Sequence, residues 1–160
     1  MNNVIDAIVE IPHGSKNKYE IDHNTGCIRL DRVLTASNVY PAEYGIIDKT
    51  LASDGDPLDI LILTNEKTYP GCVVPARVLG YLEMVDRGAL DYKLISVVDV
   101  DPRFAEINDL SDLSEVTLKE IKNFFENYKS LDDIEVEVGE YHSKEEALAL
   151  IEECKKAYKG

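Results

Sequence analysis

Short apolar runs separated by Gly, Pro, Asn and Asp dominate the chain between residues 4 and 98. Runs of this length, rich in Val, Ile, Leu and Tyr and bounded by turn residues, predict β-strands. Asn24-Thr25-Gly26 separates two of the runs and predicts a hairpin turn. We expect strands at residues 4–11, 17–22, 27–32, 58–63, 72–84 and 90–98. Five or six such strands suggest a small barrel.

A helical period replaces this pattern in the last third of the chain. Apolar residues recur after three, seven and ten positions, which places them on one face of a helix that we expect from about Glu115 to Lys129. The residues of this face are Leu118, Ile121, Phe125 and Tyr128.

A short strand and a second helix follow. Residues 134–138 alternate apolar residues with Glu and predict the strand. Ser143 and Glu146 have the S-x-x-E spacing of a capping box and predict the start of the helix. Lysines suit the C-terminal end of a helix, and this one carries Lys155, Lys156 and Lys159. The chain shows no repeat or linker, so we expect residues 1–160 to form a single domain.

Composition narrows the function classes. The 160 residues include 31 acidic and 17 basic side chains, for a formal net charge of −14. This balance argues against a general binder of nucleic acid or anionic membrane, which requires clustered Lys and Arg. Three cysteines and three histidines at unrelated spacings predict neither a disulfide framework nor a structural zinc site. With no targeting segment and no apolar run of membrane-spanning length, we expect a reduced, cytoplasmic protein.

The segment Asp54-Gly55-Asp56-Pro57-Leu58-Asp59 is the most informative in the chain. Gly55 and Pro57 shape a turn from which three carboxylates can converge on a hard cation, which prefers oxygen ligands. A solvated turn is the alternative, and it is the better interpretation of an isolated D-G-D. An EF-hand fits poorly, because the positions that require Gly and Glu hold Asp59 and Asn65.

Strand parity adds mixed charges to these carboxylates. Residues two apart share a face of a strand. Lys18 and Glu20 form one such pair. Asp91 and Lys93 form another, which follows Asp86 in the sequence. One carboxylate beside one ammonium suits a site that binds cations together with an oxyanion. Each pair alone is equally consistent with a surface salt bridge of small energy.

Tyrosines supply further donors in two places. Tyr40 and Tyr44 lie in a turn-rich segment, where their hydroxyls can donate to anionic oxygens or their rings can pack at a barrel rim. Tyr128 and Lys129 end the first predicted helix, where they can complete its apolar face and cap its dipole. Periodicity does not choose between these interpretations.

Together these segments resemble, in order, the motifs of the family I soluble inorganic pyrophosphatases. The match extends from Glu10 to Lys129 and comprises Glu10, Lys18–Asp22, Asp31-Arg32, Tyr40–Gly45, Asp54–Asp59, Asp86 with Asp91–Lys93, and Phe124–Lys129. The resemblance implies a mainly β (α+β) fold, an OB-fold-like five-stranded barrel with two flanking α-helices. It also implies hydrolysis of pyrophosphate to two phosphates with several Mg²⁺ ions per subunit.

The resemblance also implies a role for each matched position. It implies that the metal ligands, direct or through water, are Glu10, Glu20, Asp54, Asp56, Asp59, Asp86 and Asp91. Asp56 would in addition act as general base toward a metal-bridging water. The phosphates would be held by Lys18, Arg32, Lys93, Tyr128 and Lys129, with hydrogen bonds from Tyr40 and Tyr44. Short members of this type are usually homohexamers, and we expect one here.

Residue chemistry agrees with this mechanism, because a nucleophile can approach the tetra-anion pyrophosphate only where its charge is cancelled. The chain departs from the family in lacking tryptophan around residues 134–141, which concerns packing and subunit contacts. A Mg²⁺-dependent hydrolase of nucleotides or other phosphoesters is the first alternative, although no base or ribose fingerprint is present. An OB-fold oligonucleotide-binding module and a Ca²⁺-binding module are the others, and the net charge of −14 disfavours the former.

Overall fold

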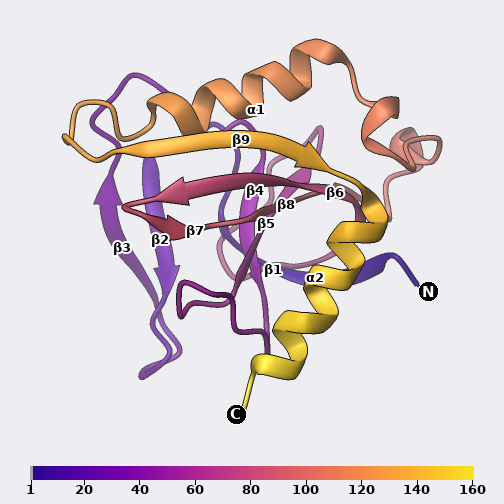
Figure 1. Ribbon diagram of the computed structural model, residues 1–160, viewed down its shortest axis with the longest axis horizontal. Coiled ribbons are helices and arrows are strands. Elements are labelled where there is room, and N and C mark those ends of the chain that lie inside the picture. The colour runs from indigo at the N-terminus through magenta and orange to yellow at the C-terminus, as the bar shows by residue number, and fades with distance from the viewer. Residues whose placement is uncertain (1) are drawn as a thin grey trace.

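Five strands close into a barrel in the computed structural model, which describes residues 2–160 (Figure 1). They are β1 (Val4–Ile11), β4 (Glu43–Ile47), β5 (Leu58–Leu63), β8 (Lys93–Val98) and β6 (Val73–Asp86), in this order around the ring. Pairing of β1 with β6 closes it. All neighbours are antiparallel except β5 and β8, which are parallel. The expected OB-like five-stranded barrel is confirmed.

The membership of the barrel differs from the sequence prediction in one respect. β2 (Asn17–Ile21) and β3 (Ile28–Val33) form the expected hairpin, but they pair only with each other, as a separate two-stranded sheet among residues 2–160. This hairpin stands beside the barrel, on the left in Figure 1. The barrel position that it leaves is taken by β4, which was not predicted as a strand.

β4 escaped prediction because it carries no alternation. All five of its residues are buried, so apolar and polar positions do not alternate along it, and Pro41 and Gly45 gave the segment the appearance of a turn. Gly45 is there for a different reason. A Cβ on Gly45 would lie 2.2 Å from the carbonyl oxygen of Ile8, so only glycine allows β4 to approach β1 this closely.

Strand β9 (Val136–His142) widens the sheet by pairing with β6, and a two-residue strand β7 (Ala89–Leu90) pairs with the end of β6. β9 was predicted at residues 134–138 and lies further along the chain, because its pairing with β6 continues from Asp86 back to Tyr81. The strand expected at residues 90–98 is interrupted before β8, so that Asp91 falls in the break.

Both predicted helices are present. α1 (Glu115–Asn127) begins after the N-cap Ser114 and ends two residues before the predicted boundary, with Tyr128 as its C-cap. α2 (Lys144–Ala157) begins after Ser143, whose hydroxyl accepts a hydrogen bond from the Glu146 backbone as predicted. The Glu146 carboxylate accepts from that hydroxyl and lies beside His142 instead of completing a capping box. Two 3₁₀ turns (Pro102–Phe104 and Leu110–Asp112) precede α1.

Two apolar clusters fix the helices to the barrel. The first fills the barrel and extends to α2 through Ala147, Ile151 and Cys154. The second joins α1 to the barrel through aromatic rings, with centroids 4.7 Å apart for Tyr40 and Phe124. No helix within residues 2–160 has the length and apolar character needed to cross a membrane. Three tyrosines of the second cluster, Tyr40, Tyr44 and Tyr128, also line a cavity.

Candidate active site

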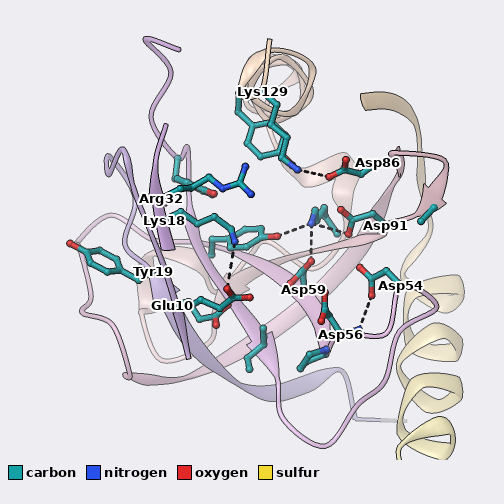
Figure 2. Close-up of a pocket in the computed structure, with 18 of the residues that line it drawn as sticks. Glu10, Lys18, Tyr19, Arg32, Asp54, Asp56, Asp59, Asp86, Asp91 and Lys129 are labelled. Atoms are coloured by element: carbon teal, nitrogen blue, oxygen red, sulfur yellow. Dashed lines mark hydrogen bonds and ion pairs between the residues drawn. The ribbon is translucent and has the colours of Figure 1, made fainter. Parts of the chain in front are cut away.

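A cavity of about 460 Å³ opens between the β2–β3 hairpin, the barrel and the end of α1. Figure 2 shows charged side chains from these separate elements pointing into it. Residues from every matched motif line it, including all of those for which a role was expected: Glu10, Lys18, Glu20, Arg32, Tyr40, Tyr44, Asp54, Asp56, Asp59, Asp86, Asp91, Lys93, Tyr128 and Lys129. The fold therefore brings the predicted residues together in one place.

Three aspartates from two parts of the chain form the acidic side of this cavity. Asp54 comes from the turn that leads into β5, Asp59 from the start of β5, and Asp91 from the break before β8. One carboxylate oxygen from each lies within 4.8 Å of the others. Burial raises the pKa of both Asp54 and Asp91, and nearby carboxylates add to the increase. Asp56 lines the same cavity outside this group of three, and its backbone N–H donates to Asp54 Oδ1 at 3.1 Å.

Lys93 is a buried ammonium that contacts two of these aspartates. Its Nζ donates to the Tyr44 hydroxyl at 2.7 Å, to Asp59 at 2.8 Å and to Asp91 at 2.9 Å. Burial alone would lower the pKa of Lys93, but the Asp59 and Asp91 carboxylates outweigh it and raise that pKa well above its usual value. Lys93 thus stays charged and holds two carboxylates of the cluster in place.

The remaining cations lie mainly on the opposite side of the cavity (Figure 2). Lys129 Nζ lies 2.6 Å from Asp86 Oδ2, so it reaches across to the end of β6 instead of capping α1. Lys18 Nζ lies 2.8 Å from Asp31 and 4.0 Å from Glu20. Arg32 follows Asp31 on β3, with Nε at 3.8 Å from that carboxylate. The hairpin therefore contributes two cations that are held by neighbouring acids.

Glu10 is the most buried carboxylate of the set. It accepts a hydrogen bond from the Ile21 backbone N–H at 2.9 Å, which ties β1 to the hairpin. Burial raises the pKa of Glu10 to about 7, against the opposing effect of that hydrogen bond. Glu20, from the same hairpin, is exposed at the cavity wall.

The tyrosines serve the core and the cavity at once. Tyr40, Tyr44 and Tyr128 are all buried, and their rings pack with Phe124 and Phe125 of α1. Each also lines the cavity. Burial raises the pKa of all three phenols, so they remain protonated donors near neutral pH. The packing interpretation is therefore confirmed, and a role of the hydroxyls toward anionic oxygens stays a prediction.

The ligand atoms that this cavity offers suit divalent cations. The cluster offers carboxylate oxygens only, which hard cations such as Mg²⁺ prefer. In addition, Asp86 Oδ1 is buried and has no hydrogen-bond partner within residues 2–160, although Lys129 satisfies the other oxygen. A buried carboxylate oxygen without a donor is costly unless a cation balances it.

Six lining residues had no predicted role: Tyr19, His23, Ile46, Pro57, Arg87 and Ala89. Three of them, Tyr19, Pro57 and Arg87, directly adjoin predicted residues in the sequence. Arg87 is the only one of the six with a permanent positive charge. The only signal for it in the sequence was its position between Asp86 and Gly88.

An OB-like barrel whose cavity combines clustered carboxylates, a buried lysine and further cations suits a hydrolase that uses divalent cations. The inorganic pyrophosphatase family model matches residues 7–159. Inorganic pyrophosphatases from Halalkalibacterium halodurans and Geobacillus stearothermophilus are 53% and 52% identical, and the matches cover 98% and 96% of this chain and 96% and 93% of theirs. The crystal structure of inorganic pyrophosphatase from Thermus thermophilus has a TM-score of 0.95 at 43% identity, covering 99% of this chain and 92% of that one. The chain belongs to the inorganic pyrophosphatase family, as its motifs predicted.

Proposed function

We propose that this chain hydrolyses inorganic pyrophosphate to two phosphates and depends on Mg²⁺. The observation that carries the proposal is the single cavity in which three converging carboxylates face the cations of the hairpin and of the segment after α1. Family membership and the names of the relatives support the substrate. A cavity of this composition suits a small polyanion that arrives with divalent cations.

Seven carboxylates would hold the ions, directly or through water: Glu10, Glu20, Asp54, Asp56, Asp59, Asp86 and Asp91. When bound, Mg²⁺ would neutralise phosphate charge and lower the pKa of water. The protein prepares this arrangement by keeping Asp59 and Asp91 fixed on Lys93. Because Lys93 compensates part of their charge, the acidic cluster can exist before any cation arrives.

Asp56 is the general base in this proposal. Its carboxylate takes a proton from the attacking water, whose oxygen forms a bond to one phosphorus while the bond from that phosphorus to the bridging oxygen breaks. The bridging oxygen leaves as part of the second phosphate. Asp56 suits the role because it is exposed at the cavity wall and its backbone is fixed on Asp54.

The phosphates would be held by cations and phenols from separate elements: Lys18 and Arg32 of the hairpin, Lys93 of β8, and Tyr128 with Lys129 after α1. Tyr40 and Tyr44 would add hydroxyl donors. Such groups orient the substrate and stabilise charge that develops on the departing phosphate. Their spread over several elements explains why the site depends on the folded barrel.

Phosphate release from pyrophosphate, with Mg²⁺ and with EDTA, tests the proposal directly. We expect release only with Mg²⁺, and much faster than from ATP or from a simple phosphomonoester. Preferential hydrolysis of ATP or of the monoester would instead favour the phosphoesterase alternative. Salt-sensitive binding of single-stranded nucleic acid without hydrolysis would favour an oligonucleotide-binding module.

We further propose that residues 1–160 form one domain, that the chain assembles as a homohexamer and that it works in the cytoplasm. The family resemblance supports the assembly, and the three free cysteines suit a reducing compartment. Size-exclusion chromatography with light scattering tests the assembly, and a monomer peak would contradict it.

A further inference from the structure

Arg87 occupies a backbone conformation that disfavours arginine. It lies in the turn Asp86-Arg87-Gly88-Ala89 between β6 and β7, with φ of 53° at Arg87 and 81° at Gly88. Two positive φ angles at the central positions are typical of a type I′ turn, in which Asn, Asp or Gly is preferred at the first of them. The Arg87 backbone N–H donates to the Glu135 carbonyl at 3.3 Å, so the segment before β9 helps hold the turn. A disfavoured residue kept in a turn at a cavity points to a use for its side chain.

Arg87 also differs from the other cations of the cavity. Lys18 and Arg32 lie near Asp31, while Lys93 and Lys129 contact acids of the cavity itself. Arg87 is exposed, and within residues 2–160 its guanidinium forms no ion pair or hydrogen bond. It therefore offers a charge that no protein carboxylate has already compensated.

The chemistry of the Arg87 side chain excludes a metal-binding role and favours the binding of an anion. A guanidinium cannot ligate a cation, and Asp86 beside it is already paired with Lys129. Its donors instead match the oxygens of a phosphate, which a guanidinium binds through two parallel hydrogen bonds. Arg87 lines the same cavity as Lys129, and in the sequence it directly follows Asp86, which is the partner of Lys129.

We propose that Arg87 is an additional substrate-binding residue, which contacts the phosphate group that lies nearest to Lys129 and Asp86. This inference rests on the proposed function, since it assigns Arg87 to the same substrate. The contact is made with bound substrate and with phosphate product alike. It therefore contributes to binding, and little to the chemical step.

The test compares Arg87→Asn, which suits a left-handed turn, with Arg87→Lys and with the control Lys49→Asn. Lys49 is an exposed cation with φ of 57° that lies outside the cavity lining, so it matches Arg87 in charge and conformation. Steady-state pyrophosphate hydrolysis gives KM and kcat. Calorimetric titration with methylenediphosphonate in Mg²⁺ gives binding without turnover. Thermal unfolding shows that each variant is folded.

We expect Arg87→Asn to raise KM and the methylenediphosphonate Kd by roughly three- to tenfold, with kcat within about twofold of the wild type. Arg87→Lys should retain part of the binding, and Lys49→Asn all of it. Unchanged binding in Arg87→Asn, or an equal loss in Lys49→Asn, would overturn the assignment. A wild-type chain that binds methylenediphosphonate but does not hydrolyse pyrophosphate would reject the proposed function, while the binding comparison would still decide the role of Arg87.

Discussion

Lys93 links stability to site geometry at the scale of a single residue. Its ammonium is buried with three oxygens at 2.7–2.9 Å, two of them carboxylates of the cavity. A buried charge of this kind is tolerated because its partners are fixed and complementary. The same contact keeps Asp59 and Asp91 at one end of the parallel strands β5 and β8, whose register pairs Asp59 with Lys93. Strand pairing thereby places Asp59 beside the lysine that also holds Asp91.

Asp56→Asn tests the proposed general base. The amide preserves the size of the side chain but cannot accept a proton from water, so we expect kcat to fall by about 100-fold or more at neutral pH with the fold retained. The measurement is phosphate release from pyrophosphate in Mg²⁺. Asp48→Asn is the matched control, because Asp48 is exposed and lies outside the cavity lining. Turnover near that of the wild type in Asp56→Asn would remove Asp56 from its role.

Asp54→Asn tests whether the cluster of three aspartates binds Mg²⁺. A cation that binds only the folded protein raises the thermal midpoint, by an amount that follows its concentration relative to Kd. We expect Mg²⁺ to raise the midpoint of the wild type by several degrees, and of Asp54→Asn by about half as much or less. The asparagine oxygen can still accept from the Asp56 backbone, so the turn should persist. An equal Mg²⁺ shift in both proteins would place the ion elsewhere.

At the scale of elements, the close approach of β4 to β1 depends on Gly45. A methyl group there would meet the Ile8 backbone at 2.2 Å, and backbone cannot move aside as a side chain can. We expect Gly45→Ala to lower the free energy of unfolding by about 3 kcal/mol, measured by urea denaturation. Gly139→Ala in β9 is the control, since its nearest new contact is the Glu83 side chain at 3.1 Å. Equal effects of the two substitutions would contradict a special role for Gly45.

The elements also show which features the sequence allowed us to predict. Motifs that carry their own signal, such as the hairpin turn and the apolar face of α1, were placed within a few residues. β4 was not, because a strand buried on both faces lacks alternation and Gly45 resembled a breaker. Prediction of the cavity residues came from the family resemblance, since strand parity alone left surface salt bridges equally acceptable. Arg87 was missed because its exposure to the cavity depends on how the β6–β7 turn meets the segment before β9.

At the scale of the whole molecule, the net charge of −14 lies mostly outside the cavity. The seven expected metal ligands are partly compensated by Lys18, Arg32, Lys93 and Lys129, and Arg87 adds a fifth permanent cation to the lining. A protein that repels polyanions over most of its surface thus has a mixed-charge site for one small polyanion. This distribution favours entry of the substrate together with divalent cations, which reduce its charge beforehand.

His142 joins α2 to the sheet and should make the stability of the molecule depend on pH. Its Nδ1 lies 2.7 Å from Glu146 of α2, its Nε2 lies 3.5 Å from Glu83 of β6, and its ring stacks on Tyr81. The hydrogen bond to Glu146 raises the pKa of His142 above 6.5, and the same contact lowers the pKa of Glu146 below 4.5. The histidine contribution is therefore complete below pH 6.5 and is lost as pH rises through the higher folded-state pKa. The Glu146 contribution is complete above pH 4.5 and is lost in more acidic solution.

We expect His142→Asn to lower the thermal midpoint by about 1–2 °C near pH 5.5, and by less at pH 8.5. Glu146→Gln should follow the same profile, whereas Glu145→Gln, in the same turn of α2, should not. A His142→Asn deficit that stays constant from pH 5.5 to 8.5 would show that the ring contributes by packing on Tyr81 and not by its charge.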